Sequence, residues 1–281
     1  MSQEWSSATN DDGQTFVFAD QGKGPLVVLW HGFPDTPSGW AGIAQALASA
    51  GYRAVAPWLR GYHPDTITAE RSYDPATLAT ETAALLDALG EETAVVVGHD
   101  WGASLTWGAA AVTPERVRAI VPIAIPHARH LPRDPGTLWK ARHFVGMKLP
   151  WAAWDLRRNS FAYIDALYRR WAPNWNGPER EKAIADVKAC YADSRSLEGA
   201  LDYYRALSPN LPRELTKTPA VRALVVGGTV DLVPADAFEK SAALLGAGSE
   251  VLIVEGAGHW PHREGEEAFT EKLLGFLASL D

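Results

Sequence analysis

The sequence predicts an α/β protein with a mostly parallel sheet, helices on both faces and an inserted helical cap. Short apolar runs alternate with helical patterns over the first 126 residues, which is typical of parallel strands joined by helices. From about residue 127 this alternation gives way to a segment rich in Trp, Arg, Tyr and Pro, and it returns after residue 216. We therefore expect residues 1–126 and 217–281 to form the core, and residues 127–216 to form the helical cap, or lid, domain.

Six apolar runs are predicted to be strands. The run at residues 93–97 (TAVVV) has no polar face, which indicates a strand buried on both sides. The other five runs lie at residues 25–30 (PLVVLW), 52–57 (YRAVAP), 117–125 (VRAIVPIAI), 221–226 (VRALVV) and 250–254 (EVLIV).

Five segments with helical spacing separate or follow these strands. The segment at residues 75–89 begins at Asp74-Pro75, where Pro suits the first turn, and stops before Gly90. The other four segments span residues 40–50, 103–112, 235–245 and about 264–280. Three acidic residues suit the start of the last helix through its dipole: Glu264, Glu266 and Glu267.

Composition excludes several classes of protein. The 281 residues include 26 Lys and Arg against 34 Asp and Glu, a net charge of −8 that makes no basic footprint for nucleic acid. The single cysteine, Cys190, excludes an internal disulfide framework and a cysteine-based metal cluster. The polar start has no signal-peptide pattern, and no apolar run approaches the roughly 20 residues of a membrane span. We expect a cytoplasmic protein with no nucleic-acid partner and no membrane partner.

The turn after the buried strand at residues 93–97 carries the strongest chemical signal. Its sequence, Gly98-His99-Asp100-Trp101-Gly102, has the form of a nucleophile elbow, in which two glycines allow a sharp turn and the middle side chain is exposed. That residue is usually Ser, and here it is Asp100. The simpler interpretation is an ordinary turn in which Asp100 caps the following helix.

Two later turns supply an acid and a histidine. Asp231 follows the strand at residues 221–226, and His259 follows the strand at residues 250–254. Alone, Asp231 suits a solvated turn and His259 a turn histidine bonded to its surroundings. The order Asp100, Asp231, His259 matches the nucleophile, acid and histidine of the α/β-hydrolase fold, so we predict a catalytic triad.

An oxyanion hole is predicted from two backbone N–H groups. In the α/β-hydrolase fold one comes from the residue after the nucleophile, and the other from a loop after an earlier strand. These positions correspond to Trp101 and to Phe33, which lies in His31-Gly32-Phe33-Pro34. A simple Gly-Pro turn is the alternative for that loop.

These motifs resemble those of epoxide hydrolases in the α/β-hydrolase superfamily, and haloalkane dehalogenases are the nearest alternative. The resemblance covers nearly the whole chain. Arg60-Gly61-Tyr62 resembles the family's Arg-Gly-Tyr stretch, but Trp58 stands where the family usually has Asp.

The nucleophile type favours attack at saturated carbon. A carboxylate suits that attack because the product is an ester that water can hydrolyse. Asp100 would open the epoxide, His259 would activate water, and Asp231 would orient His259. The scheme yields a vicinal diol and needs no metal and no organic cofactor. The expected partners are a small apolar or aromatic epoxide and water, with the oligomeric state left open between monomer and homodimer.

The resemblance also implies ring-opening donors in the cap. Tyr204 matches the family's tyrosine before Arg. The second family tyrosine lies seven residues before a Pro, and here that position is His143. Tyr163 and Tyr168 are alternative donors.

Two other functions are weighed against epoxide hydrolysis. Phe33 weakens the dehalogenase interpretation, because typical haloalkane dehalogenases have Asn or Glu there. A non-catalytic ligand-binding protein on the same scaffold is the third hypothesis, disfavoured by the complete triad.

His262 is expected at the surface. Five cap tryptophans are expected to pack the helical layer against the core, with an aromatic substrate pocket as the alternative: Trp139, Trp151, Trp154, Trp171 and Trp175.

Overall fold

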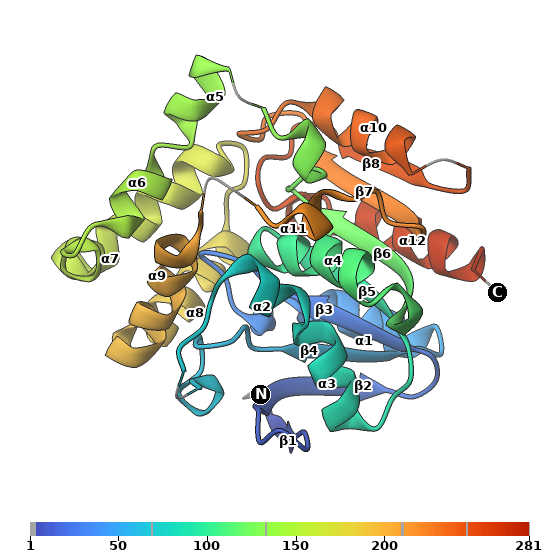
Figure 1. Ribbon diagram of the computed structural model, residues 1–281. Coiled ribbons are helices and arrows are strands. Elements are labelled where there is room, and N and C mark those ends of the chain that lie inside the picture. The colour runs from blue at the N-terminus through green and yellow to red at the C-terminus, as the bar shows by residue number, and fades with distance from the viewer. Residues whose placement is uncertain (1–3, 69, 133, 209–210, 246, 281) are drawn as a thin grey trace.

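A computed structural model describes residues 4–68, 70–132, 134–208, 211–245 and 247–280. These residues form a single eight-stranded sheet in the order β1-β2-β4-β3-β5-β6-β7-β8 (Figure 1). The pairs β1/β2 and β2/β4 are antiparallel and all other pairs are parallel. The strands are β1 Ser6–Thr9, β2 Thr15–Gly22, β3 Leu26–Trp30, β4 Arg53–Pro57, β5 Ala94–His99, β6 Val117–Ile123, β7 Arg222–Gly228 and β8 Glu250–Val254.

Helices cover both faces of the sheet, which confirms the predicted fold class. One face packs apolar side chains against α1 and α12, and the other packs them against α3, α4 and α10. Each face therefore has its own apolar core. The helices of this part of the chain are η1 Pro37–Trp40, α1 Ala41–Ser49, η2 Pro64–Thr66, α2 Pro75–Ala79, α3 Glu81–Leu89, α4 Trp101–Val112, η3 Pro114–Arg116, α10 Ala235–Leu244, α11 Pro261–Glu264 and α12 Glu266–Ala278.

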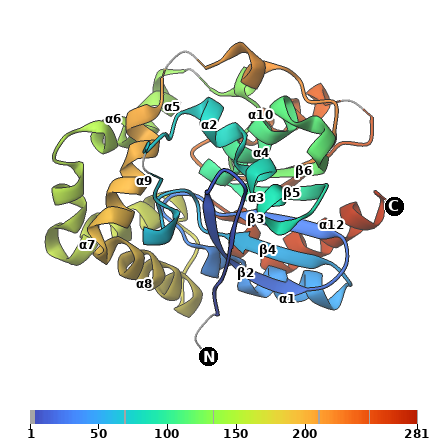
Figure 2. The ribbon, with the colours of Figure 1, turned by 60° about the horizontal axis from the view of Figure 1, so that its bottom comes forward.

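A helical insertion, defined here as residues 127–216, separates β6 from β7. Figure 2 shows α6 to α9 gathered at one end of the sheet. Its division from the core at residues 126 and 217 stays a prediction. The elements of the insertion are η4 Ala128–His130, α5 Pro135–Lys140, α6 His143–Lys148, α7 Ala152–Trp171, α8 Pro178–Ala192, α9 Ser194–Ala206 and η5 Arg213–Thr216.

The tryptophans of the insertion divide into two groups. Trp171 and Trp175 are buried, as expected for residues that pack the insertion against the core. For Trp139, Trp151 and Trp154 that expectation is wrong, because all three are more than half exposed. Two of them are covered on one face by an arginine, with Arg142 over Trp139 and Arg158 over Trp154.

Several predicted boundaries are wrong. The antiparallel strands β1 and β2 were not expected. The helix predicted over residues 75–89 is two helices, which meet at Thr80, and the hydroxyl of Thr80 donates to the carbonyl of Thr77. The helix expected from about residue 264 is also two helices, and Glu264 ends the first of them instead of starting the second.

The parallel strands bring the predicted site residues to one edge of the sheet. The loops after β3, β5, β7 and β8 carry Phe33, Asp100, Asp231 and His259 in turn. Since the carboxyl ends of parallel strands meet at a common edge, this is where an open α/β sheet builds its ligand sites. Within the described ranges, no helix combines the length and apolar character that crossing a bilayer requires.

Candidate active site

Asp100 lies in a sharp turn between β5 and α4. Its backbone has φ 53° and ψ −114°, a conformation that is costly for a residue with a side chain. The glycines on either side make the turn possible, because a Cβ at Gly98 would lie 2.1 Å from the carbonyl oxygen of Gly102. A Cβ at Gly102 would lie 2.3 Å from the carbonyl oxygen of Trp30. The Asp100 side chain is thereby presented above the sheet edge, as a nucleophile elbow requires.

The three predicted triad residues lie in contact. The Nε2 atom of His259 is 3.4 Å from Oδ2 of Asp100, and its Nδ1 atom is 3.1 Å from Oδ1 of Asp231. Asp231 Oδ1 also accepts a hydrogen bond of 2.6 Å from the N–H of Leu232, which orients the carboxylate. The side chains of His259 and Asp231 are 5% and 0% exposed, and that of Asp100 is 13% exposed. The imidazole therefore lies between two carboxylates and out of bulk water.

The two carboxylates decide the protonation state of His259. Burial alone would lower the pKa of His259, but the charges of Asp231 and Asp100 and their hydrogen bonds outweigh it and raise the pKa from 6.5 to about 10. At neutral pH the imidazole is therefore charged in the resting protein. Removal of one of the two negative charges would lower this pKa.

Phe33 contacts the carboxylate from the other side. Its backbone N–H donates a hydrogen bond of 2.8 Å to Oδ1 of Asp100. The preceding Gly32 allows this approach, because a Cβ there would lie 2.5 Å from the Cβ of Asp100. For the N–H of Trp101, which the sequence also assigns to the oxyanion hole, the described residues show no hydrogen bond to Asp100, and its role stays a prediction.

The predicted ring-opening donors come from two helices of the insertion. Tyr204 on α9 is buried, and its ring lies 5.1 Å from that of Phe33 and 5.2 Å from that of Trp101. These two residues are the neighbours of Asp100 described above. Burial and the charge of Asp100 raise the pKa of Tyr204 well above its usual value of 10, so the phenol stays protonated. His143 on α6 is buried as well, with its ring 6.1 Å from that of Tyr204.

The alternative tyrosines differ in how their hydroxyls are used. The hydroxyl of Tyr168 donates a hydrogen bond of 2.7 Å to the carbonyl of Pro34, and its ring stacks on Trp260 at 4.2 Å. Tyr168 therefore holds the insertion on the loop after β3. Burial raises the pKa of Tyr163, whose hydroxyl interacts with Arg170.

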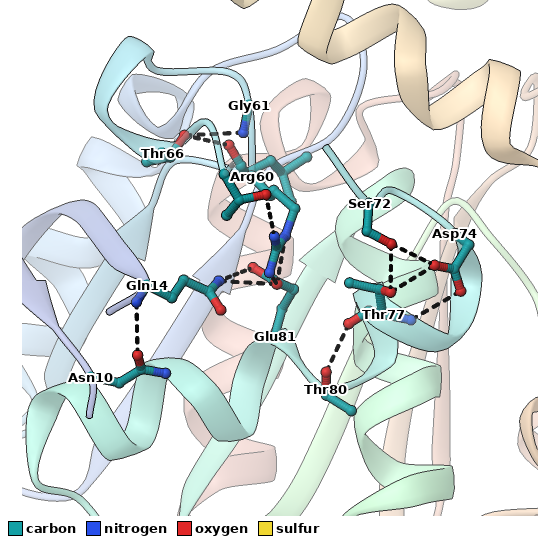
Figure 3. A network of polar contacts seen from close by, with 12 residues as sticks. Asn10, Gln14, Arg60, Gly61, Thr66, Ser72, Asp74, Thr77, Thr80 and Glu81 are labelled. Atoms are coloured by element: carbon teal, nitrogen blue, oxygen red, sulfur yellow. Dashed lines mark hydrogen bonds and ion pairs between the residues drawn. The ribbon is translucent and has the colours of Figure 1, made fainter. Parts of the chain in front are cut away.

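A buried polar network joins the turn before β2, the loop after β4 and the start of α3 (Figure 3). Arg60 forms an ion pair with Glu81, and Gln14 donates hydrogen bonds of 3.0 Å to both oxygens of Glu81. The hydroxyl of Tyr203 donates a hydrogen bond of 3.0 Å to the backbone carbonyl of Arg60. Tyr203 precedes Tyr204, so the Arg60-Gly61-Tyr62 segment, whose purpose the sequence did not indicate, anchors the helix that carries the predicted donor.

The close contact of α9 with this segment depends on a glycine. A Cβ at Gly199 would lie 2.1 Å from the carbonyl oxygen of Gly61. A larger residue at position 199 would therefore push α9, and Tyr204 with it, away from the core.

An apolar cavity opens beside Asp100. It has a volume of about 180 Å³ and is lined mainly by apolar side chains from α4 and the insertion, including Trp101, Trp107, Phe144 and Leu207. Asp100 is the charged residue on this lining. Such a cavity suits an uncharged, apolar molecule.

A second group of buried polar side chains lies behind His259. Asp35, His99 and His262 offer ligand atoms within 4.8 Å of one another, which is close enough for all three to bind one metal ion. The oxygens of Asp35 already accept hydrogen bonds of 3.2 Å from Arg263 and from the indole of Trp260. The positive charge of Arg263 opposes a second cation there, so this group is better suited to internal packing.

His262 corrects the expectation that it lies at the surface. It is 1% exposed, with its ring 4.6 Å from that of Trp40 and 4.7 Å from that of His99. Burial lowers its pKa well below 6.5. Sequence position alone gave no signal of this, because the short helix α11 turns His262 inward.

Known proteins with related sequences fit this architecture. A family model described as alpha/beta hydrolase fold matches residues 25–266. The chain is 32% identical to an epoxide hydrolase of Caballeronia sordidicola, over 99% of this chain and 94% of that protein. It is 29% identical to epoxide hydrolase A of Mycobacterium tuberculosis, over 97% and 96% of the two chains.

Solved structures give the same relationship. An epoxide hydrolase from Vigna radiata superposes with a TM-score of 0.79 at 26% identity, over 98% of both chains. An epoxide hydrolase from an endophytic Streptomyces superposes with a TM-score of 0.76 at 26% identity, over 99% of this chain and 96% of the other.

Proposed function

Because the chain is an epoxide hydrolase-like member of the alpha/beta hydrolase fold family, we propose that it converts an epoxide to a vicinal diol through an alkyl ester formed on Asp100. The observation that carries this proposal is the placement of the Asp100 carboxylate. One oxygen accepts a hydrogen bond from the N–H of Phe33, and the other faces His259. Asp100 occupies the position of a nucleophile elbow at which serine is usual.

In the first step Asp100 attacks a carbon of the epoxide. A bond forms between a carboxylate oxygen and that carbon, and the bond from the carbon to the epoxide oxygen breaks. The departing oxygen takes a proton from Tyr204, assisted by His143. The raised pKa of Tyr204 keeps this proton in place until the alkoxide develops.

The first step also prepares the base for the second. Esterification removes the negative charge of Asp100, which is one of the causes that hold the pKa of His259 near 10. The imidazolium can then return a proton to the Tyr204 phenolate. This leaves both groups neutral, with no net proton release to solvent.

In the second step neutral His259 takes a proton from water, and the resulting hydroxide attacks the carbonyl carbon of the Asp100 ester. Negative charge develops on the carbonyl oxygen, which the N–H groups of Phe33 and Trp101 stabilise. Collapse breaks the bond between that carbon and the alkyl oxygen, which takes the proton of the newly added hydroxyl group and leaves as the diol. His259 keeps the proton that it took from water and is charged again, as in the resting protein. Asp100 is again a carboxylate and now carries one oxygen from water.

The cavity supports a small apolar or aromatic epoxide as substrate. An apolar cavity of about 150 Å³ is large enough to bind benzene. The cavity beside Asp100 has about 180 Å³, so a ring of that size with a short substituent fits. Water is the second substrate, and the scheme uses no cofactor.

Substitution of the base tests the proposal. In His259→Gln, displacement by Asp100 should continue while ester hydrolysis fails, so the alkyl-enzyme should accumulate. Intact mass measured after substrate addition should rise by the mass of one epoxide. His63→Gln, a substitution of a partly exposed histidine outside the triad, should leave no adduct. An unchanged mass in His259→Gln, with an epoxide that the wild type consumes, would contradict the proposal.

A further inference from the structure

We propose that Glu264 is a positioning residue for ester hydrolysis, because its carboxylate holds the backbone on both sides of His259. This inference rests on the proposed function, in which His259 is the base of the second step. From the sequence, Glu264 is expected at the start of the last helix, with no part in the site.

The two oxygens of Glu264 bind two different peptide groups. Oε2 accepts a hydrogen bond of 2.9 Å from the N–H of Gly258, and Oε1 accepts one of 3.0 Å from the N–H of Trp260. These residues immediately precede and follow His259. Hydrogen bonds to an ionised acceptor are stronger than neutral ones, so the carboxylate fixes the short segment that carries the imidazole.

The peptide groups of His259 itself are held by two other elements. Its N–H donates a hydrogen bond of 2.9 Å to the carbonyl of Trp171, the last residue of α7. Its carbonyl accepts one of 2.7 Å from Nε2 of His99, at the end of β5. These four hydrogen bonds come from three parts of the fold, and they hold residues 258–260 together with backbone hydrogen bonds from α11 to the Trp260 carbonyl.

Of these holding groups, the Glu264 carboxylate is the most direct to test by substitution. The Trp171 acceptor is a backbone carbonyl, and His99 belongs to the elbow that positions Asp100. Glu264 contacts neither Asp100 nor Tyr204 among the described hydrogen bonds. A change at Glu264 therefore loosens the segment of the base and leaves the nucleophile and the ring-opening donor in place.

The two half-reactions depend differently on this segment. Attack by Asp100 does not use His259 as a base, whereas hydrolysis needs Nε2 aimed at the attacking water. A misplacement of about 1 Å can cost on the order of 100-fold in rate. Loss of positioning should therefore slow hydrolysis of the ester and spare its formation.

The test is Glu264→Gln, which preserves size but offers one oxygen and one NH₂ group. One of the two peptide N–H groups then faces a donor instead of an acceptor. In single-turnover experiments we expect ester formation to stay within about twofold of wild type and ester hydrolysis to slow by about 10- to 100-fold. The alkyl-enzyme should accumulate and be visible by intact mass. Glu267→Gln, a matched change at an exposed position on α12, should behave as wild type.

The outcomes separate this inference from the proposed function. Equal slowing of both half-reactions, or no change in either, would overturn the role of Glu264. A residue with only a structural role would not slow ester hydrolysis selectively. His259→Gln is measured alongside. If it accumulates adduct and Glu264→Gln does not, only the positioning role fails. If His259→Gln accumulates none, the proposed mechanism itself is overturned. Glu264→Asp keeps the charge, and partial recovery of hydrolysis relative to Glu264→Gln is expected.

Discussion

The N–H of Phe33 donates a hydrogen bond of 2.8 Å to Oδ1 of Asp100, and this contact distinguishes the two oxygens of the carboxylate. Oδ2 lies 3.4 Å from His259 Nε2. Oδ1 is thus already where the carbonyl oxygen of an ester would be stabilised, and Oδ2 is the oxygen expected to attack the epoxide. In the proposed reaction, Oδ2 is therefore the oxygen used in the first step and Oδ1 the oxygen stabilised in the second.

The coupling between Asp100 and His259 predicts a change in pKa. In Asp100→Asn one negative charge beside the imidazole is lost, so the pKa of His259 should fall below the value of about 10 in the wild type. Titration of the His259 ring followed by NMR measures this shift. Asp236→Asn, at an exposed position paired with Lys240, serves as control and should leave the pKa of His259 unchanged. A His259 pKa equal to that of the wild type in Asp100→Asn would refute the coupling.

The same pKa predicts how stability depends on pH. The folded protein binds the His259 proton more tightly than the unfolded chain, because the pKa is raised from 6.5 to about 10. The resulting stabilisation is fully present below pH 6.5 and is lost as pH rises through about 10. The free energy of unfolding by urea should therefore decline more steeply over this range in the wild type than in His259→Gln. Parallel pH profiles for the two proteins would contradict the prediction.

Tyr204 should matter for an epoxide and not for a halide. Tyr204→Phe removes the proton donor, and loss of a general acid typically costs about 100-fold or more. Ring opening should slow by that amount, whereas a halide leaves as an anion and needs no proton. The measurement compares alkyl-enzyme formation from an epoxide and from a haloalkane of similar size. Equal losses with both substrates would remove Tyr204 from the donor role, and halide release without diol formation from any epoxide would favour a dehalogenase.

Tyr203 should act on the first step through α9. Tyr203→Phe removes the hydrogen bond to the carbonyl of Arg60, which should cost about 0.5–1.5 kcal/mol of stability. Because α9 also carries Tyr204, ester formation should slow while ester hydrolysis is unchanged, the opposite of Glu264→Gln. Tyr52→Phe is the control, because Tyr52 directly precedes β4 and so lies at the amino end of that strand, opposite the edge that carries the site. Slower hydrolysis with normal ester formation would rule out this role.

Much of the fold follows from local sequence patterns. The apolar runs before Asp100, Asp231 and His259 have few polar residues, so they predict parallel strands and place these residues at one edge. The N-terminal strands were missed because β1 (SSAT) is polar and largely exposed and β2 (TFVFADQG) turns polar over its second half. Their pairing with the sheet is a tertiary interaction that no local period reveals.

The parts of the site that were not predicted depend on contacts between distant segments. Glu264 is the last residue of the short helix α11, and its side chain reaches back to Gly258 and Trp260, which lie just before that helix. His262 is buried because that helix packs on Trp40. The link from Tyr203 to Arg60 joins residues 143 positions apart in the sequence. Residue type and spacing predicted which side chains meet at the candidate site, but not the groups that hold them.

The covalent ester on Asp100 is tested most directly by one turnover in water enriched in oxygen-18, with enzyme in excess over epoxide. The ester mechanism predicts that one heavy oxygen is incorporated into the Asp100 carboxylate, and that the diol formed in this turnover carries oxygen from the enzyme. Peptide mass spectrometry of the segment containing Asp100 measures the label. A diol that carries the heavy oxygen, with an unlabelled Asp100, would mean that water attacks the epoxide directly, and the ester mechanism would be wrong.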